Sequence, residues 1–295
     1  MEPFVLSWFL VFLLSLVVWG IIGSSWVVRQ PRYAPSANPS DVGIPWEPVR
    51  FTAKDGIRLD GWLVRSRSPQ GVLILLHGFG TCKADLLDVI QAFALHGSCH
   101  LISIDFRGHG CSEGSTFSFG KRETMDIEAV LDYLSASSEF KDLPVGCYGI
   151  SMGGAIGIIA AAHFPKIKAV VSDSAYGDFG KAVARALRMA YHIPRFPLGQ
   201  IVVWFAQLRL GCSAKSISPK CLVGRVSPRP VLIIHGTADK TVPWEDGQSI
   251  YDAAKDPKRL WLVPESEHVA CFYRDRMSYT RTVLGFFENE FRRTP

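Results

Sequence analysis

Charge is missing from the start of this chain. Apart from Glu2, no charged residue occurs before Arg29, so residues 3–28 form an uncharged, largely apolar run. A helix of about 20 residues crosses the core of a bilayer, and this run is longer. It is not typical of a cleaved signal peptide, because Glu2 stands where such peptides carry Lys or Arg and no A-x-A-like cleavage site comes after it. We therefore predict a transmembrane anchor over residues 1–28.

Positive charge flanks only one side of this run. Arg29 and Arg32 come after it, whereas Glu2 and the α-amino group precede it. The positive-inside rule therefore favours a single-pass membrane protein whose C-terminal domain lies in the cytoplasm.

Paired cysteines are also absent. The seven cysteines are scattered singly, with no C-x-x-C pair and no Cys/His spacing typical of zinc sites. The Asn-x-Ser sequence at Asn38 has Pro39 in the middle, which blocks glycosylation. These features argue against a disulfide framework or a structural zinc site and agree with a reducing compartment.

Features of nucleic-acid and nucleotide-binding proteins are lacking as well. The net charge is only +5, and no nucleic-acid-binding module is recognisable. No glycine-rich phosphate loop and no metal signature occurs. We therefore expect no cofactor, no metal and no nucleic-acid partner.

The chain beyond the anchor is organised as a linker and one domain. Residues 29–48, rich in proline and serine, read as a linker, and residues 49–295 as the domain. Two strand-like runs flank Asp55-Gly56, a strong hairpin signal. Short apolar runs then alternate with helix-like stretches, such as the one at residues 84–95. This alternation predicts an α/β fold with a doubly wound, mostly parallel sheet.

An insertion at about residues 177–228 interrupts the alternation. It contains two helix-like pieces split by Pro194 and Pro197, so we expect a helical cap. The cap has eight basic residues against the single acid Asp178, with apolar and aromatic residues between them. Two interpretations stay open: a lid with a solvated basic face, or a surface that meets anionic lipid and admits acyl chains.

The sequence GISMG at residues 149–153 separates a strand-like run from a helix-like run of small residues. A serine between glycines at such a turn is typical of a nucleophile elbow, although a tight turn without chemistry also needs small residues. Functional groups of open α/β sheets gather at the carboxyl ends of the strands. The acidic, basic and hydroxyl side chains at or beyond those ends include His77, Asp105, Arg107, His109, Ser151, Asp173, His235, Thr237, Asp239 and His268.

Ser151, Asp239 and His268 occur in the chain order of a Ser-acid-His triad. His268 is the candidate base, because a serine hydroxyl needs an adjacent imidazole to take its proton. Asp239 would orient that imidazole, and Asp173 is the alternative acid. His77 and His235 each precede a glycine and are expected to orient loops instead.

An oxyanion intermediate would need two N–H donors. The backbone of Met152, after the serine, should supply one, and the backbone of Phe79, in the loop after the "GVLILL" strand, the other.

The chain resembles the α/β-hydrolase superfamily, in its serine aminopeptidase-like and monoacylglycerol lipase-like branch. It is most similar to the membrane-anchored bud-emergence-type α/β-hydrolases. The resemblance covers the chain from about Arg50 to its end, except the cap. It rests on five motifs in the expected order: "LLHGFG", "IDFRGHGCSEG", "YGISMGGAIG", "RPVLIIHGTADKTVPWEDG" and "LWLVPESEHVACF".

The resemblance implies the α/β-hydrolase fold and a serine hydrolase that cleaves a carboxylester, lipid-like ester or thioester through an acyl-enzyme. A peptidase or amidase of the same fold is the alternative. A non-catalytic binding protein of this fold is a further alternative, although no triad residue is missing. The expected partners are an ester substrate, small or lipid-like, and a membrane contacted by the N-terminal helix and the basic cap.

Overall fold

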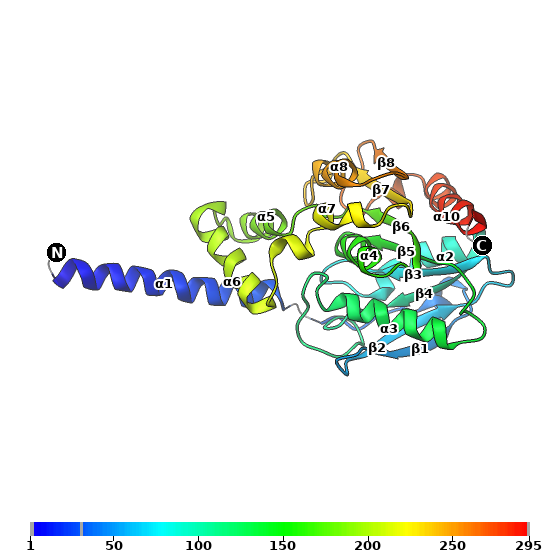
Figure 1. Ribbon diagram of the computed structural model, residues 1–295, viewed down its shortest axis with the longest axis horizontal. Coiled ribbons are helices and arrows are strands. Elements are labelled where there is room, and N and C mark those ends of the chain that lie inside the picture. The colour runs from blue at the N-terminus through cyan, green and yellow to red at the C-terminus, as the bar shows by residue number, and fades with distance from the viewer. Residues whose placement is uncertain (1–2, 30–31, 294–295) are drawn as a thin grey trace.

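The computed structural model describes residues 3–29 and 32–293. Glu2 and residues 30–31 of the predicted linker lie outside these ranges. Helix α1 (Pro3–Val27) projects from the rest of the molecule (Figure 1). Its segment Ser7–Val27 is long and apolar enough to cross a membrane, by length and composition.

A β-hairpin begins the α/β domain. Strand β1 (Glu47–Thr52) pairs antiparallel with β2 (Arg58–Val64). The chain turns between them at Asp55-Gly56, where Gly56 has a φ of +84° that a side chain would disfavour. The hairpin signal in the sequence therefore corresponds to a real turn.

The remaining six strands form the parallel part of one sheet. They are β3 (Gly71–Leu76), β4 (Cys99–Ile104), β5 (Val145–Ile150), β6 (Ile167–Asp173), β7 (Val231–Gly236) and β8 (Lys258–Val263). The strand order is β1-β2-β4-β3-β5-β6-β7-β8, and only the pairs β1/β2 and β2/β4 are antiparallel. The predicted doubly wound, mostly parallel sheet is confirmed.

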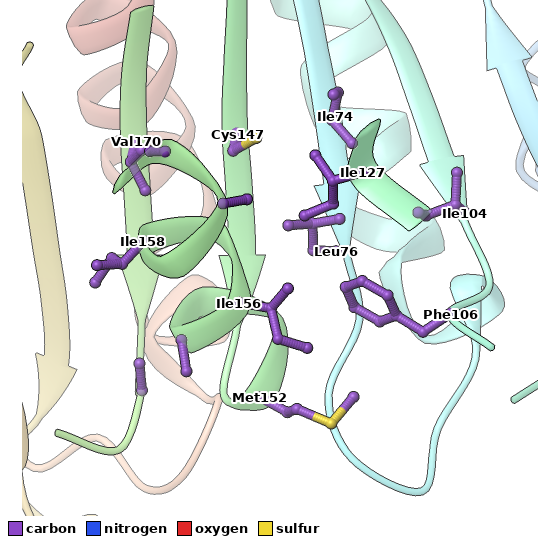
Figure 2. Close-up of a cluster of buried hydrophobic side chains, with 14 of the residues drawn as sticks. Ile74, Leu76, Ile104, Phe106, Ile127, Cys147, Met152, Ile156, Ile158 and Val170 are labelled. Carbon is purple, nitrogen blue, oxygen red and sulfur yellow. The ribbon is translucent and has the colours of Figure 1, made fainter. Parts of the chain in front are cut away.

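Helices cover both faces of this sheet (Figure 1). One face packs against α3 (Glu123–Ala136), α4 (Met152–His163) and α8 (Trp244–Ala253), and the other against α2 (Leu87–His96) and α10 (Arg276–Arg293). The short helix α9 (Cys271–Arg274) precedes α10. Figure 2 shows the first layer, where Ile156 and Met152 of α4 lie against strand residues such as Leu76. The apolar strands are thus buried on both faces, as parallel strands require.

The helix expected at residues 84–95 begins later than its sequence suggests. A 3₁₀ turn at Lys83–Leu86 comes first, and α2 comes after it. The N–H of Cys82 donates to Asp85 at 2.9 Å, and the N–H of Lys83 donates to Asp105 at 2.8 Å. These side-chain acceptors hold the tighter turn, which apolar periodicity alone does not reveal.

The inserted segment after β6 is helical. It consists of α5 (Phe179–Tyr191), a π-helical turn (Arg195–Gly199), α6 (Gln200–Leu210) and the short helical turns Ala214–Ile217, Pro219–Leu222 (α7) and Val223–Arg225. We call α5, α6 and the turn between them the cap helices. A proline cannot donate to a helix, so Pro194 and Pro197 separate the two longer helices.

Helix α6 packs directly against α1 (Figure 1). A Cβ atom at Gly20 would lie 2.2 Å from Cδ2 of Phe205, and one at Gly23 would lie 2.7 Å from Cγ2 of Val202. The N-terminal helix and the cap helices therefore form one packed unit.

Candidate active site

Ser151 lies on the sharp turn between β5 and α4. Its φ is +50° and its ψ is −117°, a strained conformation for a residue with a side chain. Such strain costs about 1–3 kcal/mol and concentrates at functional sites. The Ser151 N–H donates to the carbonyl of Asp173 at 2.7 Å and helps to hold the turn. The Ser151 side chain reaches a cavity at the carboxyl end of the sheet.

Three predicted side chains meet at this turn. His268, on the loop after β8, places Nδ1 2.6 Å from Oδ2 of Asp239 and Nε2 3.0 Å from Oγ of Ser151. When the Nδ1–H donates to Asp239, the Nε2 lone pair is left to accept the Ser151 hydroxyl. The arrangement can therefore move a proton away from the serine.

The carboxylate of Asp239 is stabilised in its charged form. Burial alone would raise its pKa, but hydrogen bonds from His235 and His268 lower the pKa to about 2. The backbone N–H groups of Thr241 and Val242 also donate to its Oδ1, at 2.9 and 2.8 Å. Asp239 is consequently an anion at neutral pH, able to stabilise an imidazolium at His268.

Asp173, the alternative acid, has other partners. Tyr279 donates to its Oδ2 at 2.7 Å, and Ser174 donates to its Oδ1 at 2.8 Å. Burial raises the pKa of Asp173. Among the described residues, no hydrogen bond joins it to His268. The structure therefore brings Asp239, not Asp173, to the imidazole.

The two expected N–H donors flank Ser151. Met152 is the first residue of α4, so its amide has no acceptor within the helix. On the opposite side, a Cβ atom at Gly78 would lie 3.7 Å from Cβ of Ser151, so the loop that carries Phe79 runs beside the serine. Met152, Phe79 and Ser151 line the same cavity.

His77 orients that loop, as expected. Its Nδ1 lies 2.7 Å from the carbonyl of Gly78, and its Nε2 accepts the N–H of Phe106 at 3.0 Å. Burial lowers its pKa to about 4, so the buried ring is neutral at pH 7. His235 likewise has a local partner, the carbonyl of Val242 at 2.8 Å. Its Nε2 also lies 3.4 Å from Asp239, a contact for which the sequence carries no signal.

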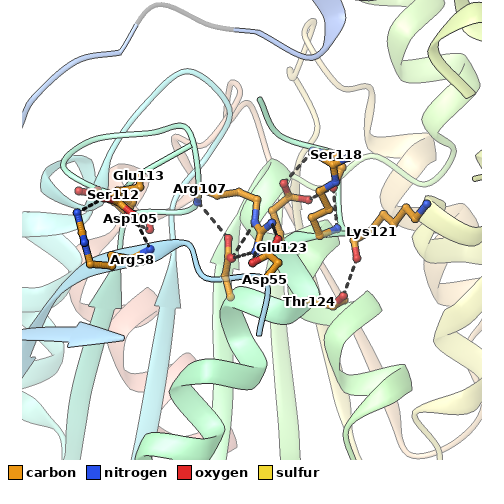
Figure 3. A network of polar contacts seen from close by, with 12 residues as sticks. Asp55, Arg58, Asp105, Arg107, Ser112, Glu113, Ser118, Lys121, Glu123 and Thr124 are labelled. Carbon is orange, nitrogen blue, oxygen red and sulfur yellow. Dashed lines mark hydrogen bonds and ion pairs between the residues drawn. The ribbon is translucent and has the colours of Figure 1, made fainter. Parts of the chain in front are cut away.

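The "IDFRGHGCSEG" motif forms a network of ion pairs beside the site (Figure 3). Arg107 donates to Asp126 from Nε at 2.8 Å and to Asp55 from a terminal nitrogen at 2.5 Å. Asp105 accepts the Lys83 ammonium at 2.5 Å. The motif thus fixes the loops around the site.

One group among the described residues has the spacing of metal ligands: Asp60, Asp105 and Cys111. The ammonium of Lys83 already lies 2.7 Å from Asp60 and 2.5 Å from Asp105. Because this cation neutralises both carboxylates, the group does not fit a metal ion.

The cavity beside Ser151 has a volume of about 290 Å³ and a mostly apolar lining. Its walls come from the loop that carries Phe79, the turn at Ser151 and Met152, the loop after β7, helix α5 and the end of α1. The lining residues are Trp26, Val27, Phe79, Phe119, Ser151, Met152, Tyr176, Ala182, Val183, Arg185, Ala186, Leu187, Met189, Ala190, Tyr191, Thr241 and Val242. No sequence motif assigned a site role to Trp26, Phe119 or Tyr176. The only feature of the sequence that could have drawn attention to Trp26 is that it is an aromatic residue near the end of the apolar run.

Comparisons with known proteins agree with this architecture. A family model described as the alpha/beta hydrolase fold matches residues 71–192. The protein YqkD of Bacillus subtilis is 28% identical in a match that covers 79% of this chain and 76% of the length of YqkD. The membrane protein YNL320W of Saccharomyces cerevisiae is 25% identical in a match that covers 78% of this chain and 76% of the length of YNL320W.

Among solved structures, the esterase Pf2001 of Pyrococcus furiosus superposes with a TM-score of 0.74. The match covers 90% of this chain and 98% of the esterase, at 23% sequence identity. At that identity the likeness establishes the fold. Together with the matching family model and the mostly parallel eight-stranded sheet, it shows that the chain has the α/β-hydrolase fold that the resemblance drawn from the sequence implied.

Proposed function

We propose that the protein is a serine ester hydrolase in which Ser151, His268 and Asp239 act as a catalytic triad. The observation that carries this proposal is the pair of contacts made by His268, at 3.0 Å to the serine hydroxyl and 2.6 Å to the carboxylate. A serine hydroxyl is a weak nucleophile until a neighbouring base accepts its proton. The strained backbone of Ser151 supports the same role.

In the proposed mechanism, Oγ of Ser151 attacks the acyl carbon while Nε2 of His268 takes the hydroxyl proton. The N–H groups of Met152 and Phe79 stabilise the oxyanion. His268 then gives the proton to the departing alcohol oxygen, and an acyl-enzyme remains. Water, deprotonated by His268, attacks that ester and releases the carboxylic acid. Asp239 stays ionised throughout and stabilises the imidazolium.

The lining of the cavity favours an ester with an apolar acyl group. Arg185 is the one charged residue among the described residues that line it, and Asp246 already pairs with it at 2.7 Å. A peptidase that recognises a free amine would need a carboxylate there, and the described lining has none. These features support a carboxylester, thioester or lipid-like ester over an aminoacyl amide.

We also propose that α1 spans a membrane. Its length and composition, and the yeast membrane protein among the relatives, support this role. The positive-inside rule, applied to Arg29 and Arg32, favours a hydrolase domain on the cytoplasmic side.

A substrate series tests the proposed activity. We expect the full-length protein in detergent to hydrolyse p-nitrophenyl esters, with higher kcat/KM for octanoate than for acetate, because the cavity wall is apolar. The alanine p-nitroanilide serves as the amide comparison. Turnover of the anilide with none of the esters would contradict the proposal and favour the amidase alternative.

A further inference from the structure

The last turn of α1 forms part of the cavity that holds Ser151. Trp26 and Val27 line it together with residues of α5. The ring of Trp26 lies against that of Tyr191, the last residue of α5, with centroids 5.1 Å apart. A helix that served only as a tether would not need to contact the cap at this point.

The packing of α6 fixes where this turn lies. Gly20 and Gly23 leave room for Phe205 and Val202, so the two helices approach closely. Small residues allow such an approach between helices in a membrane as well as in water. Arg209 adds a hydrogen bond from Nε to Oγ of Ser24 at 3.3 Å. These contacts hold Trp26 at the mouth of the cavity.

The same contacts determine where the cap helices would lie relative to a bilayer crossed by α1. All of them involve residues 20–27, the final part of the apolar helix, so a bilayer crossed by α1 would meet the cap helices where α1 emerges from it. Apolar side chains are exposed here: Phe196 is 79% exposed, and Trp204, beside Phe205, is 55% exposed. Arg188 and Arg195 are exposed nearby and carry the charge that anionic headgroups attract.

We propose that the last turn of α1 is a wall of the acyl-binding pocket and that the substrate is a membrane-resident ester. Its acyl chain would pass from the bilayer between Trp26 and α5 to Ser151. This inference rests on the proposed serine ester hydrolase function and adds the substrate class and the route. The cap helices pack against α1, which we propose to span the bilayer. The bilayer is therefore the partner expected to cover the exposed apolar side chains of the cap helices.

The test compares two tryptophans of the same helix in the full-length protein, reconstituted in phosphatidylcholine vesicles. Trp26→Ala removes the wall, whereas Trp8→Ala is the matched control. Trp8 is 61% exposed, and its described ring contact is with Phe4 of the same helix. The measured quantity is the ratio of kcat/KM for p-nitrophenyl palmitate, which partitions into the vesicles, to that for the water-soluble butyrate.

We expect Trp26→Ala to lower this ratio about tenfold, since lost contacts in an apolar pocket change discrimination by that order. Trp8→Ala should leave the ratio unchanged. Tyr191→Ala, which removes the other ring of the contact, should lower the ratio in the same direction and provides a second variant if Trp26→Ala does not fold. Labelling with a fluorophosphonate identifies the variants that keep a folded site.

Two failures are distinguishable. If the wild type neither reacts with the fluorophosphonate nor turns over either ester, the proposed function is wrong and the inference fails with it. If a labelled Trp26→Ala or Tyr191→Ala protein has the same ratio as Trp8→Ala, the activity stands. In that case α1 is only a tether.

Discussion

Gly149 and Gly153 face each other across the turn that carries Ser151, with no space for a side chain. A Cβ atom on Gly149 would lie 2.3 Å from the carbonyl carbon of Gly153. A Cβ atom on Gly153 would lie 2.2 Å from the carbonyl oxygen of Leu76. All of these neighbours are backbone atoms, which cannot move aside as a flexible side chain could. The two glycines therefore let strand, turn and helix pack closely enough to present Ser151.

We predict that Gly149→Ala lowers the free energy of unfolding by about 3 kcal/mol, because the added methyl group overpacks the elbow. Gly285→Ala is the matched control. Gly285 lies in α10 with no atom within 4 Å of an added Cβ. Alanine should therefore stabilise that helix by up to about 1 kcal/mol. Equal effects of the two changes in urea unfolding would contradict the packing argument.

The choice between the two acids gives a second prediction. Asp239→Asn should lower kcat about 10⁴-fold, because an amide that donates to Nδ1 leaves the proton on the wrong nitrogen of His268. Asp173→Asn should act mainly on stability, since Asp173 accepts hydrogen bonds from Tyr279 and Ser174. Both variants would be assayed for turnover per folded molecule. A folded Asp173→Asn protein that loses far more activity than Asp239→Asn would reverse the assignment.

Because His77 is buried, we predict that the stability of the protein depends on pH. Its pKa is lowered from 6.5 to about 4 in the folded protein, mainly by burial. Between these values the unfolded chain binds a proton at this ring that the folded chain does not, so stability falls as the pH drops below 6.5. The loss attributable to His77 is about 2 kcal/mol between pH 7 and pH 5.

His77→Gln tests this, because glutamine can still donate to Gly78 and accept from Phe106 without titrating. Urea unfolding at both pH values should show a smaller loss of stability for the variant than for the wild type. An identical pH dependence in the two proteins would mean that His77 does not carry the effect.

The membrane assignment gives a fourth prediction. The protein should stay in the membrane fraction after alkaline carbonate extraction, because residues 7–27 are long enough to span a bilayer. Protease added outside sealed cells should leave the hydrolase domain intact and should digest it after permeabilisation. Carbonate release would contradict the span, and digestion in sealed cells would contradict the cytoplasmic orientation.

The sheet and the positions of the candidate residues were predictable because they depend on local patterns. Apolar runs between turn residues predicted the parallel strands. Because such strands end at one edge of the sheet, Ser151, Asp239 and His268 could be expected near one another.

Long-range packing was not predictable in the same way. The hydrogen bond between Tyr279 and Asp173 joins residues 106 positions apart, and neither residue carries a sequence signal for the other. The contact between Trp26 and Tyr191 likewise depends on how α6 packs against Gly20 and Gly23. Apolar periodicity identifies a buried face of a helix but not the partner that buries it.

Covalent labelling of the wild type and Ser151→Ala by a fluorophosphonate, with the modified peptide identified by mass spectrometry, tests directly whether Ser151 is the nucleophile. The proposed mechanism predicts one labelled serine in the wild type, Ser151, because His268 lies 3.0 Å from its hydroxyl. It also predicts no label in Ser151→Ala and a loss of ester turnover by several orders of magnitude. Undiminished labelling of Ser151→Ala, or a label on another serine of the wild type, would contradict the proposed mechanism.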